Sequence, residues 1–204
     1  MVPVRSKRVR RTVEDSRASI LEVAERHLSE DGPAGVKVQR IGRELGLSDA
    51  AIHYHFGSRD GLLEALLIYS GQRFVRDLAT ASQDVGPVGV KQASHLLNDL
   101  YGRRGAARLV AWLVQSGWTP PGSGMLLDLC KRLHDQRAGQ AVSAGERPDN
   151  LEDTQKLVAV LSALAFTNAI VGDALFRSVG LGGMTADELT SWVTDRLGAA
   201  PGGG

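Results

Sequence analysis

The stretch VQRIGRELGLSDAAIHYHF, residues 38–56, decides the fold that we expect for this 204-residue chain. Its apolar residues recur at helical steps, which predicts a short helix over residues 38–45. Gly46 ends that helix, because glycine adopts the left-handed backbone of a tight turn at little cost. Ser48 is a favourable N-cap for a second short helix. Two short helices joined by a tight turn predict a helix-turn-helix, whose second helix is narrow enough to enter the major groove of DNA.

The second of these helices has an inner and an outer side. Ala51 and Ile52 are apolar and are expected to hold the helix on the scaffold beneath it. The outer side supplies the candidates for contact with base edges and phosphates, which are Ser48, Asp49, Ala50, His53, Tyr54 and His55.

Glycine and proline divide the rest of the chain into pieces of helical length as well. Thr12 and Asp15 form a capping box that starts the first helix, and a longer helix begins after Gly57-Ser58. No segment alternates strictly between apolar and polar residues, as a strand would. The chain is therefore predicted to be all-α, with about nine helices. The later helices are expected at about residues 88–103, 105–117, 123–143, 151–179 and 186–197, the last with a second capping box at Thr185 and Glu188.

The composition is that of a soluble globular protein, with 43% hydrophobic and 23% charged residues. A single cysteine, Cys130, excludes an intramolecular disulfide, and no signal peptide opens the chain, so we expect a cytoplasmic protein. The longest nearly apolar stretch, residues 157–171, is shorter than the roughly 20 residues that a bilayer span needs. That stretch predicts a buried helix and no membrane contact.

Residues 1–11 form a basic arm with five arginine and lysine side chains and no acidic one. Arms of this kind commonly touch nucleic acid or an anionic surface. For the arm taken alone, a solvated tail that only aids solubility is the alternative interpretation.

A longer pattern surrounds the helix-turn-helix. It consists of Ile20-Leu21-x-x-Ala24, Gly32, Ile41-Gly42-x-x-Leu45-Gly46-Leu47-Ser48 and Ile52-His53-Tyr54-His55-Phe56-x-Ser58-Arg59-x-x-Leu62-Leu63. This pattern resembles the tetracycline-repressor (TetR) family of bacterial transcription regulators, and the run from Gly46 to Leu63 is its most recognisable part. From residue 70 onward the resemblance is one of architecture only.

The resemblance implies a role for each matching position. Lys37, Gln39 and Arg40, at the start of the second helix, are expected to reach phosphates or base edges, and Ser48–His55 would be the recognition helix. Arg59, which opens the fourth helix, is expected to bind a phosphate. General physics supports these roles: a helix N-terminus attracts phosphate, arginine forms charge-assisted bonds with it, and glutamine pairs with an adenine edge.

The chain departs from the family pattern in places. A tyrosine is usual at His53, a glycine is common at Ala50, and a hydroxyl side chain often stands at Lys37 or Val38. The operator sequence therefore does not follow from the resemblance. His53 is either a phosphate donor that gains strength on protonation or a neutral histidine facing the groove. His53 and His55 lie on opposite sides of a helix, so they predict no metal site.

The helix expected over residues 151–179 is apolar nearly all round and must be covered. In the family, the last two long helices of each subunit form a four-helix bundle across a two-fold axis, and helix-turn-helix proteins read two half-sites as symmetric dimers. A helix in the core of a single chain is the alternative. The residues expected at a dimer interface are Leu161, Leu164, Ala165, Asn168, Val171, Gly172, Leu175 and Trp192.

Large apolar side chains with few charges among them recur from the fourth to the seventh helix. They would suit the apolar pocket in which the family binds effectors, although ordinary core packing gives the same pattern. The candidate pocket residues are Phe74, Leu78, Trp112, Trp118, Met125 and Leu129.

The sequence and the resemblance together predict a disordered basic arm (residues 1–11), a helix-turn-helix DNA-binding domain (12–58), an effector-binding and dimerisation domain (59–198) and a flexible tail (199–204). The implied function is that of a dimeric repressor in the bacterial cytoplasm, associated with the nucleoid when it is bound to DNA. Its partners would be a palindromic double-stranded operator and a small-molecule effector that releases it, with no cofactor.

The sequence also bears on two other classes of protein. An enzyme is disfavoured, because no catalytic triad, glycine-rich phosphate loop or carboxylate cluster stands at a recognisable spacing. A family member with degenerate DNA binding, acting as a small-molecule-binding or protein-docking module, is kept open by the departures at Lys37, Val38 and His53.

Overall fold

The computed structural model describes residues 12–84, 89–119, 124, 126–145, 147–148 and 150–199. The expected arm and residues 200–204 of the expected tail lie outside these described residues. Within them every regular element is helical and no strand is present, which confirms the all-α prediction. The elements are α1 (Val13–Asp31), the 3₁₀ turn η1 (Pro33–Gly35), α2 (Val38–Leu45), α3 (Asp49–Phe56), α4 (Arg59–Asp84), α5 (Val90–Asn98), the π-helical turn η2 (Asp99–Arg103), α6 (Ala106–Gln115), α7 (Leu127–Ser143), α8 (Leu151–Ser178) and α9 (Ala186–Ala199).

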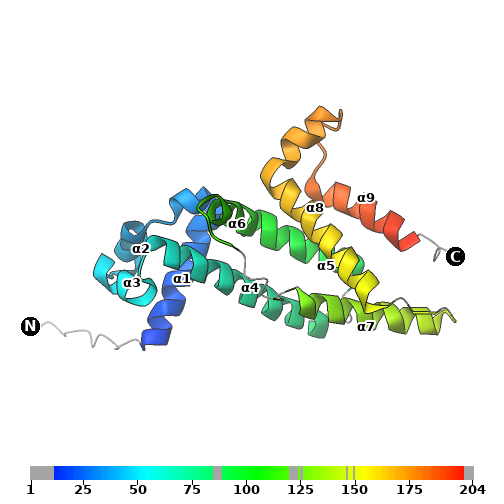
Figure 1. The fold of residues 1–204 in the computed structure, drawn as a ribbon, viewed down its shortest axis with the longest axis horizontal. Coiled ribbons are helices and arrows are strands. Elements are labelled where there is room, and N and C mark those ends of the chain that lie inside the picture. The colour runs from blue at the N-terminus through cyan, green and yellow to red at the C-terminus, as the bar shows by residue number, and fades with distance from the viewer. Residues whose placement is uncertain are drawn as a thin grey trace, which may run out of the picture.

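Helices α1, α2 and α3 form an N-terminal head, defined here as residues 12–58, at one end of the molecule (Figure 1). Apolar residues spaced along one side of α1, among them Ile20 and Leu28, meet Ile41 of α2 and Ile52 of α3 in a common core. The first turns of α4 contribute leucines to the same core, so α4 begins as part of the head's packing. Burial of these side chains fixes the mutual orientation of the three helices of the head.

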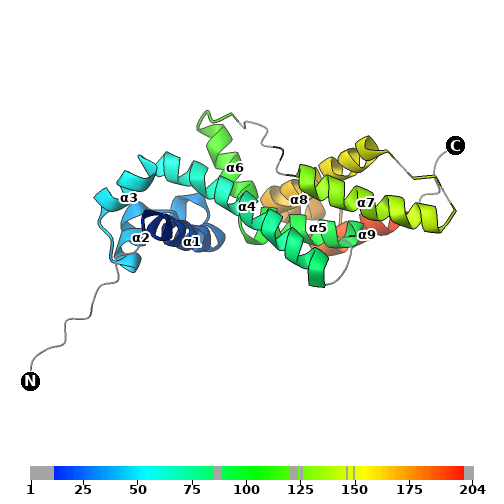
Figure 2. The same cartoon turned by 90° about the horizontal axis from the view of Figure 1, so that it is seen from below.

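Helix α4 continues from the head into a body built from α5 to α9 (Figure 2). The body has a second core, in which Phe74 and Leu78 of α4 pack against leucines of α5 and α7 and against Val158 and Leu161 of α8. The head and the body therefore share one continuous helix.

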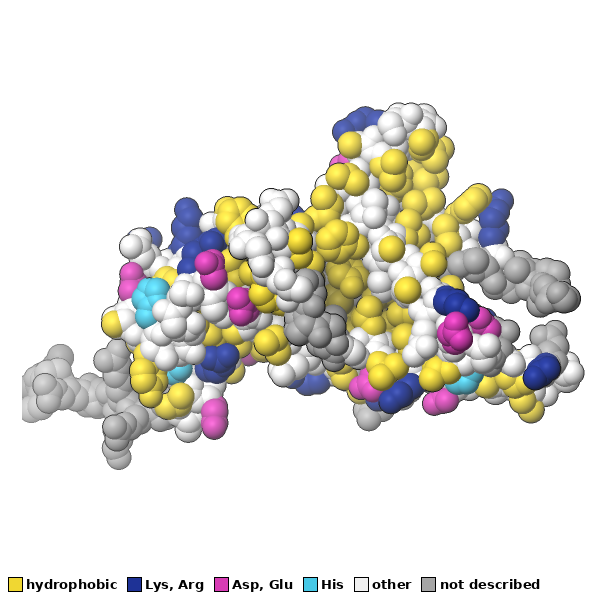
Figure 3. Space-filling view, viewed as in Figure 1, with side chains coloured by type: hydrophobic (Ala, Val, Ile, Leu, Met, Phe, Trp, Pro, Cys, Tyr) yellow, Lys and Arg dark blue, Asp and Glu magenta, His cyan; other side chains and the backbone are white. Residues whose placement is uncertain are grey.

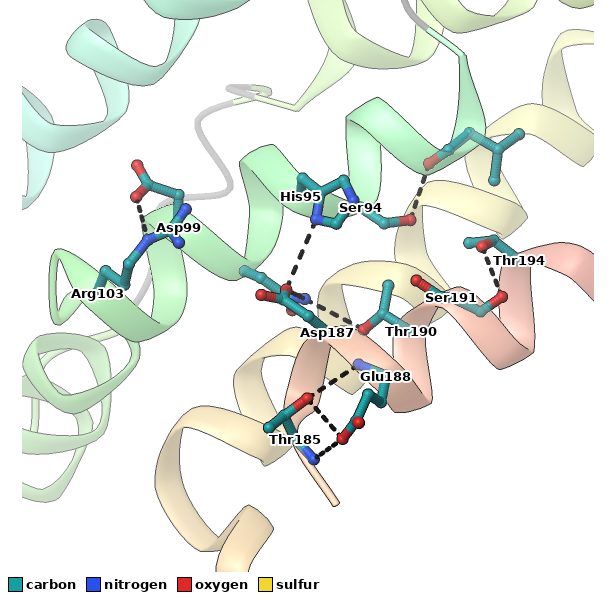
Figure 4. Close-up of polar contacts among 12 residues, drawn as sticks. Ser94, His95, Asp99, Arg103, Thr185, Asp187, Glu188, Thr190, Ser191 and Thr194 are labelled. Atoms are coloured by element: carbon teal, nitrogen blue, oxygen red, sulfur yellow. Dashed lines mark hydrogen bonds and ion pairs between the residues drawn. The ribbon is translucent and has the colours of Figure 1, made fainter. Parts of the chain in front are cut away.

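Polar contacts hold α9 against α5 (Figure 4). Asn98 Nδ2 donates to Asp187 Oδ1 at 3.0 Å and to Thr190 Oγ1 at 3.1 Å. The predicted capping box starts α9, because Thr185 N donates to Glu188 Oε2 and Glu188 N donates to Thr185 Oγ1. The bond from the Thr185 backbone lowers the pKa of the Glu188 carboxyl.

Two predicted helix boundaries differ from the structure. The helix expected over residues 88–103 is the regular helix α5 followed by the π-helical turn η2, and the helix expected from residue 123 begins at Leu127. A π-helical turn carries one extra residue, which apolar spacing alone does not reveal.

Helix α8 is less covered than the sequence predicts. By length and hydropathy it is the one described helix able to cross a membrane, yet only 28% of its most apolar window is buried within the chain. One side packs on the body, and the C-terminal part projects from it with hydrophobic side chains in view (Figures 1 and 3). The prediction of a buried helix is therefore wrong for the single chain, because nothing in the described part of the chain covers the outer side.

Candidate DNA-binding surface and ligand pocket

The turn between α2 and α3 has the tight geometry that a helix-turn-helix requires. Gly46 ends α2 in the left-handed conformation at φ 66°, and Leu47 N donates to Gly42 O at 2.8 Å. The chain passes so close to Gly42 that a Cβ atom there would lie 2.7 Å from the Leu47 carbonyl oxygen. Ser48 caps α3, with its Oγ accepting from Ala51 N at 3.2 Å. These contacts fix the angle between the two short helices.

Helix α3 presents one side to solvent and buries the other. Ile52 is 1% exposed, whereas the Tyr54 side chain is 79% exposed. Exposed with Tyr54 are Ser48, Asp49, Ala50 and His53. His55 is half-buried, and its carbonyl oxygen accepts from Arg17 Nη1 of α1 at 2.7 Å. The structure thus brings five of the six predicted α3 residues together on an open surface and turns His55 toward α1.

The His53 ring is positioned by the end of its own helix. His53 Nδ1 lies 3.0 Å from the carbonyl oxygen of Gly57, which can accept a hydrogen bond from it. In a neutral imidazole that donates from Nδ1, Nε2 is an acceptor, and on protonation it becomes a donor. The same side chain can therefore face either a base-edge donor or a phosphate.

At the start of α2, Lys37 and Gln39 are exposed, whereas the Arg40 side chain is paired with acidic side chains. The Arg40 guanidinium is ion-paired with Asp31 and lies 3.6 Å from Glu30, both at the end of α1. The hydrogen bond from Arg40 lowers the pKa of the Asp31 carboxyl. An arginine held by two carboxylates offers little net charge to a phosphate.

Arg59 points into the protein rather than out toward a phosphate. Its Nε donates to Val36 O at 3.0 Å and its Nη2 donates to Pro33 O at 2.6 Å. Its guanidinium also lies 5.6 Å from the centre of the Trp112 ring on α6. In this arrangement Arg59 holds the loop after α1 against the start of α4, a different role from the phosphate contact expected from the sequence.

The head is acidic overall despite its exposed recognition surface. Residues 12–58 contain eight aspartate and glutamate side chains and five arginine and lysine side chains, a formal charge of −3. The positive charge of this part of the molecule is therefore concentrated in residues 1–11.

The body contains a cavity of about 790 Å³ between α4, α6, α7 and α8. Its walls are mostly apolar. The lining residues used below are Leu67, Ser70, Gln72, Tyr101, Ala106, Val110, Trp118, Cys130, Gln155 and Ala159. Burial raises the pKa of the Tyr101 hydroxyl, against an opposing effect of Ser162, and burial also raises the pKa of the Cys130 thiol.

Of the six predicted pocket residues, only Trp118 lines this cavity. Phe74, Leu78 and Leu129 are buried in the body's core, so for them the core alternative is the correct one. Trp112 sits on the head-facing side of α6 near Arg59, and Met125 lies outside the described residues. The lining includes smaller residues such as Val110 and Ala159, which no size-based search of the sequence would single out. No group of three potential metal-ligating side chains occurs in the described part of the chain.

The residues predicted at a dimer interface, seven on α8 and Trp192 on α9, differ in how far their own chain covers them. Leu161, Ala165 and Gly172 are buried within their own chain. Leu164 is half-buried, and Asn168 is half-buried with both amide atoms lacking a partner among the described residues. Val171, Leu175 and Trp192 are exposed, together with Val160, Ile170 and Val179, which the prediction missed. An exposed apolar surface of this extent is typical of an interaction site.

This arrangement defines a class of protein: an all-α molecule whose helix-turn-helix head is joined by a long helix to a body that contains a pocket. Residues 20–66 match the model of the family described as bacterial regulatory proteins, tetR family. The resemblance to the tetracycline-repressor family is therefore confirmed over residues 20–66, the part of the chain that carries the helix-turn-helix.

Solved structures of similar fold extend the likeness to the body. A structure described as the molecular basis for control of antibiotic production by bacterial hormones is 19% identical and aligns over 89% of this chain and 98% of that chain, with a TM-score of 0.58. A candidate transcriptional regulator from Saccharomonospora viridis in complex with choline is 21% identical over 91% and 97%, with a TM-score of 0.57. The multidrug binding protein EbrR in complex with imidazole is 21% identical over the full length of both chains, with a TM-score of 0.50. At these identities the likeness concerns the fold. Among curated proteins, no sequence matches this chain.

Proposed function

We propose that this regulator is a homodimeric repressor that binds a palindromic operator and leaves it when a small molecule occupies the pocket. The observation that carries the proposal is the open polar side of α3, with Tyr54 exposed above a buried Ile52. A short helix with this geometry fits the major groove. The proposed DNA contacts are Lys37, Gln39, Ser48, Asp49, Ala50, His53 and Tyr54.

A second copy of the chain is the proposed cover for the exposed side of α8. Val171 and Leu175 on α8 and Trp192 on α9 would meet their counterparts across a two-fold axis. A two-fold dimer also presents two α3 helices to two half-sites, about one helical turn of DNA apart. The proposal therefore accounts for the apolar outer surface and for a palindromic operator at once.

Helix α6 contacts both the pocket and the head, so it can transmit the effect of a bound ligand to the head. Ala106 and Val110 line the pocket, while Arg108 on the same helix donates from Nη2 to the carbonyl oxygens of Leu28 at 3.4 Å and Ser29 at 3.1 Å, at the end of α1. Trp118 lines the pocket and also packs against the head's core. A ligand that shifts α6 would therefore shift the head.

The coupling follows from thermodynamics. An effector releases DNA only if it binds the DNA-incompetent arrangement more tightly, and coupling of about 1 to 3 kcal/mol is typical of such systems. The S. viridis candidate regulator with choline and EbrR with imidazole are proteins of similar fold described with small molecules, which supports this use of the pocket. We expect no catalytic activity and a cytoplasmic location.

Selection from a pool of random DNA duplexes tests the proposal. The full-length protein should enrich a two-fold symmetric sequence and retard that duplex, but not a scrambled one, in a gel-shift titration. Enrichment of no sequence would contradict DNA recognition and favour the alternative of a degenerate member that serves as a small-molecule-binding or docking module.

A further inference from the structure

The described lining of the pocket carries no side chain that is charged at neutral pH. Among its described lining residues there is no aspartate, glutamate, lysine, arginine or histidine. Moving an ion from water into such a site costs several kcal/mol unless a counter-charge or several hydrogen bonds compensate. The wall therefore disfavours ionic ligands and accepts apolar ones.

A buried carboxylate that contacts the lining residue Ser70 is already neutralised. Glu25 of α1 is buried and is ion-paired with Arg73 of α4. It also accepts a hydrogen bond from Ser70 Oγ, the hydroxyl of a lining residue, at 3.3 Å. The carboxylate has its own cation, and the Ser70 donor is already used, so neither is free to balance a charged ligand.

Apart from Trp118 and Cys130, four lining side chains carry polar groups, and they differ in depth. Ser70 is bound to Glu25, and Gln72 and Gln155 are exposed at the rim. Tyr101 is half-buried, and it stands on the π-helical turn η2, a type of turn that is frequent at functional sites. Tyr101 is therefore the polar group best placed to meet a ligand below the rim.

The surroundings of Tyr101 favour donation by its hydroxyl. The ring is fixed edge-on against Phe166, with 5.9 Å between the ring centres. Ser162 is 8% exposed, its Oγ has no hydrogen-bond partner among the described residues, and its hydroxyl opposes the rise in the pKa of Tyr101, as expected of a donor near the phenolic oxygen. When Ser162 donates to the tyrosine oxygen, the phenolic proton is free for an acceptor on the ligand.

We propose that the effector is an uncharged, predominantly apolar molecule that carries a hydrogen-bond acceptor, and that Tyr101 donates to that acceptor. This inference rests on the proposed use of the pocket as an effector site. It names the chemical class of the ligand and the residue that selects it.

Displacement of a fluorescent probe from the full-length protein, in the absence of DNA, tests whether the pocket prefers uncharged ligands to ions. N-phenyl-1-naphthylamine is uncharged and apolar and becomes fluorescent in apolar sites, so it should bind and light up. Decan-1-ol, decanoate and decylammonium share one chain length and differ in charge at neutral pH. We expect decan-1-ol to displace the probe about tenfold more tightly than either ion. No probe binding, or an ion that competes as well as the alcohol, would overturn the proposal.

Variants locate the binding in this pocket. Ala159→Trp fills the cavity from an exposed lining position and should abolish probe binding, whereas Val142→Trp, on an exposed α7 position outside the lining, should leave it intact. Gln155→Glu keeps the shape of the rim and adds a negative charge. The affinity of decylammonium for this variant should therefore be about fivefold higher than for the unaltered protein. Equal probe binding by the two tryptophan variants would place the site elsewhere and overturn the proposal.

Tyr101→Phe tests the anchor, because it keeps the ring on Phe166 and removes only the hydroxyl. Decan-1-ol should lose about threefold to tenfold in affinity while the probe, which relies on apolar contact, keeps its own. Unchanged affinity for the alcohol would reject Tyr101 as the anchor. Every measurement in this test is fluorescence in the absence of DNA. Failure to bind any duplex would therefore contradict the proposed function without affecting the test of the ligand class.

Discussion

Gln39 and Tyr54 are the two side chains from which we expect base readout. Both are exposed, on α2 and α3 respectively, and neither is needed for the head's core. Gln39→Ala and Tyr54→Ala should therefore shift the sequence selected from a random pool, with about 1 to 3 kcal/mol less discrimination at the affected base pair. Lys91→Ala, on an exposed α5 position, is the control and should select the unaltered sequence. Unaltered selection by the two test variants would show that these side chains read no bases.

Arg59 is expected to matter more for stability than for phosphate binding. Its guanidinium donates to the carbonyl oxygens of Pro33 and Val36, and truncation would leave these acceptors without that partner. Arg59→Ala should lower the free energy of unfolding in urea by about 1 to 3 kcal/mol, whereas Arg43→Ala, at an exposed position of α2, should have little effect.

The salt dependence of DNA binding separates the two roles of Arg59. With the inward geometry, Arg59→Ala should leave the slope of log affinity against log salt unchanged. A slope shallower by about one would instead return Arg59 to the phosphate role that the family pattern implies.

At the scale of elements, the turn between α2 and α3 depends on two glycines in different ways. Gly46 has a positive φ, but open space surrounds the position that a Cβ would take. Gly46→Ala should therefore lower the free energy of unfolding by about 1 to 2 kcal/mol, through backbone strain alone. At Gly42 the added Cβ would press on the Leu47 carbonyl and move the turn itself. Gly42→Ala should therefore weaken DNA binding more than Gly46→Ala does, measured at a temperature where both remain folded.

Gly139 provides the matched control for these substitutions. It lies inside α7 with open space around its missing Cβ, so Gly139→Ala should be neutral or slightly stabilising. Equal DNA binding by Gly42→Ala and Gly139→Ala would mean that the turn tolerates the displacement.

Local signals account for what the sequence predicts well. The two capping boxes, Ser48 as an N-cap and Gly46 as a helix end all act within a few residues, and each stands where it was expected. Cavities and ion pairs depend on distant residues and were predicted less well. Leu78 and Leu129 are as apolar as the lining residue Leu67, and only packing separates core from cavity.

Arg40 and Arg59 illustrate the same limit for charged residues. Their partners at Asp31, Pro33 and Val36 become neighbours only after the loop behind α1 folds back on α2 and α4. A family pattern predicts where an arginine stands in the sequence, but it does not predict which groups the arginine side chain contacts. Tyr101 was missed because an isolated tyrosine on a predicted helix gives no signal of its own.

At the scale of the whole molecule, the outer side of α8 predicts the assembly. Leu175→Glu puts a charge on this exposed apolar surface, so it should shift the protein from dimer to monomer in sedimentation and weaken operator binding, since both half-sites are then no longer held together. Val142→Glu, on an exposed and apolar α7 position away from α8 and α9, should leave the dimer intact. A dimer that survives Leu175→Glu would place the interface elsewhere.

The charge of the arm predicts how strongly DNA binding depends on salt. Residues 1–11 supply five positive side chains, and deleting them should make the slope of log affinity against log salt shallower by about four to five. An unchanged slope would mean that the arm is the solvated tail of the alternative interpretation.

The net charge of −3 on residues 12–58 also bears on how a binding site is found among a vast excess of other sequence. Because DNA is a polyanion, it repels the negatively charged head, so the head should bind non-operator sequences weakly. The protein should therefore dissociate quickly from such sequences. Attraction of DNA over longer distances would then depend on the five positive side chains of residues 1–11, and tight binding would require matched bases. If the arm supplies the attraction to any DNA and the head supplies the sequence preference, the protein can search DNA quickly and still select its operator.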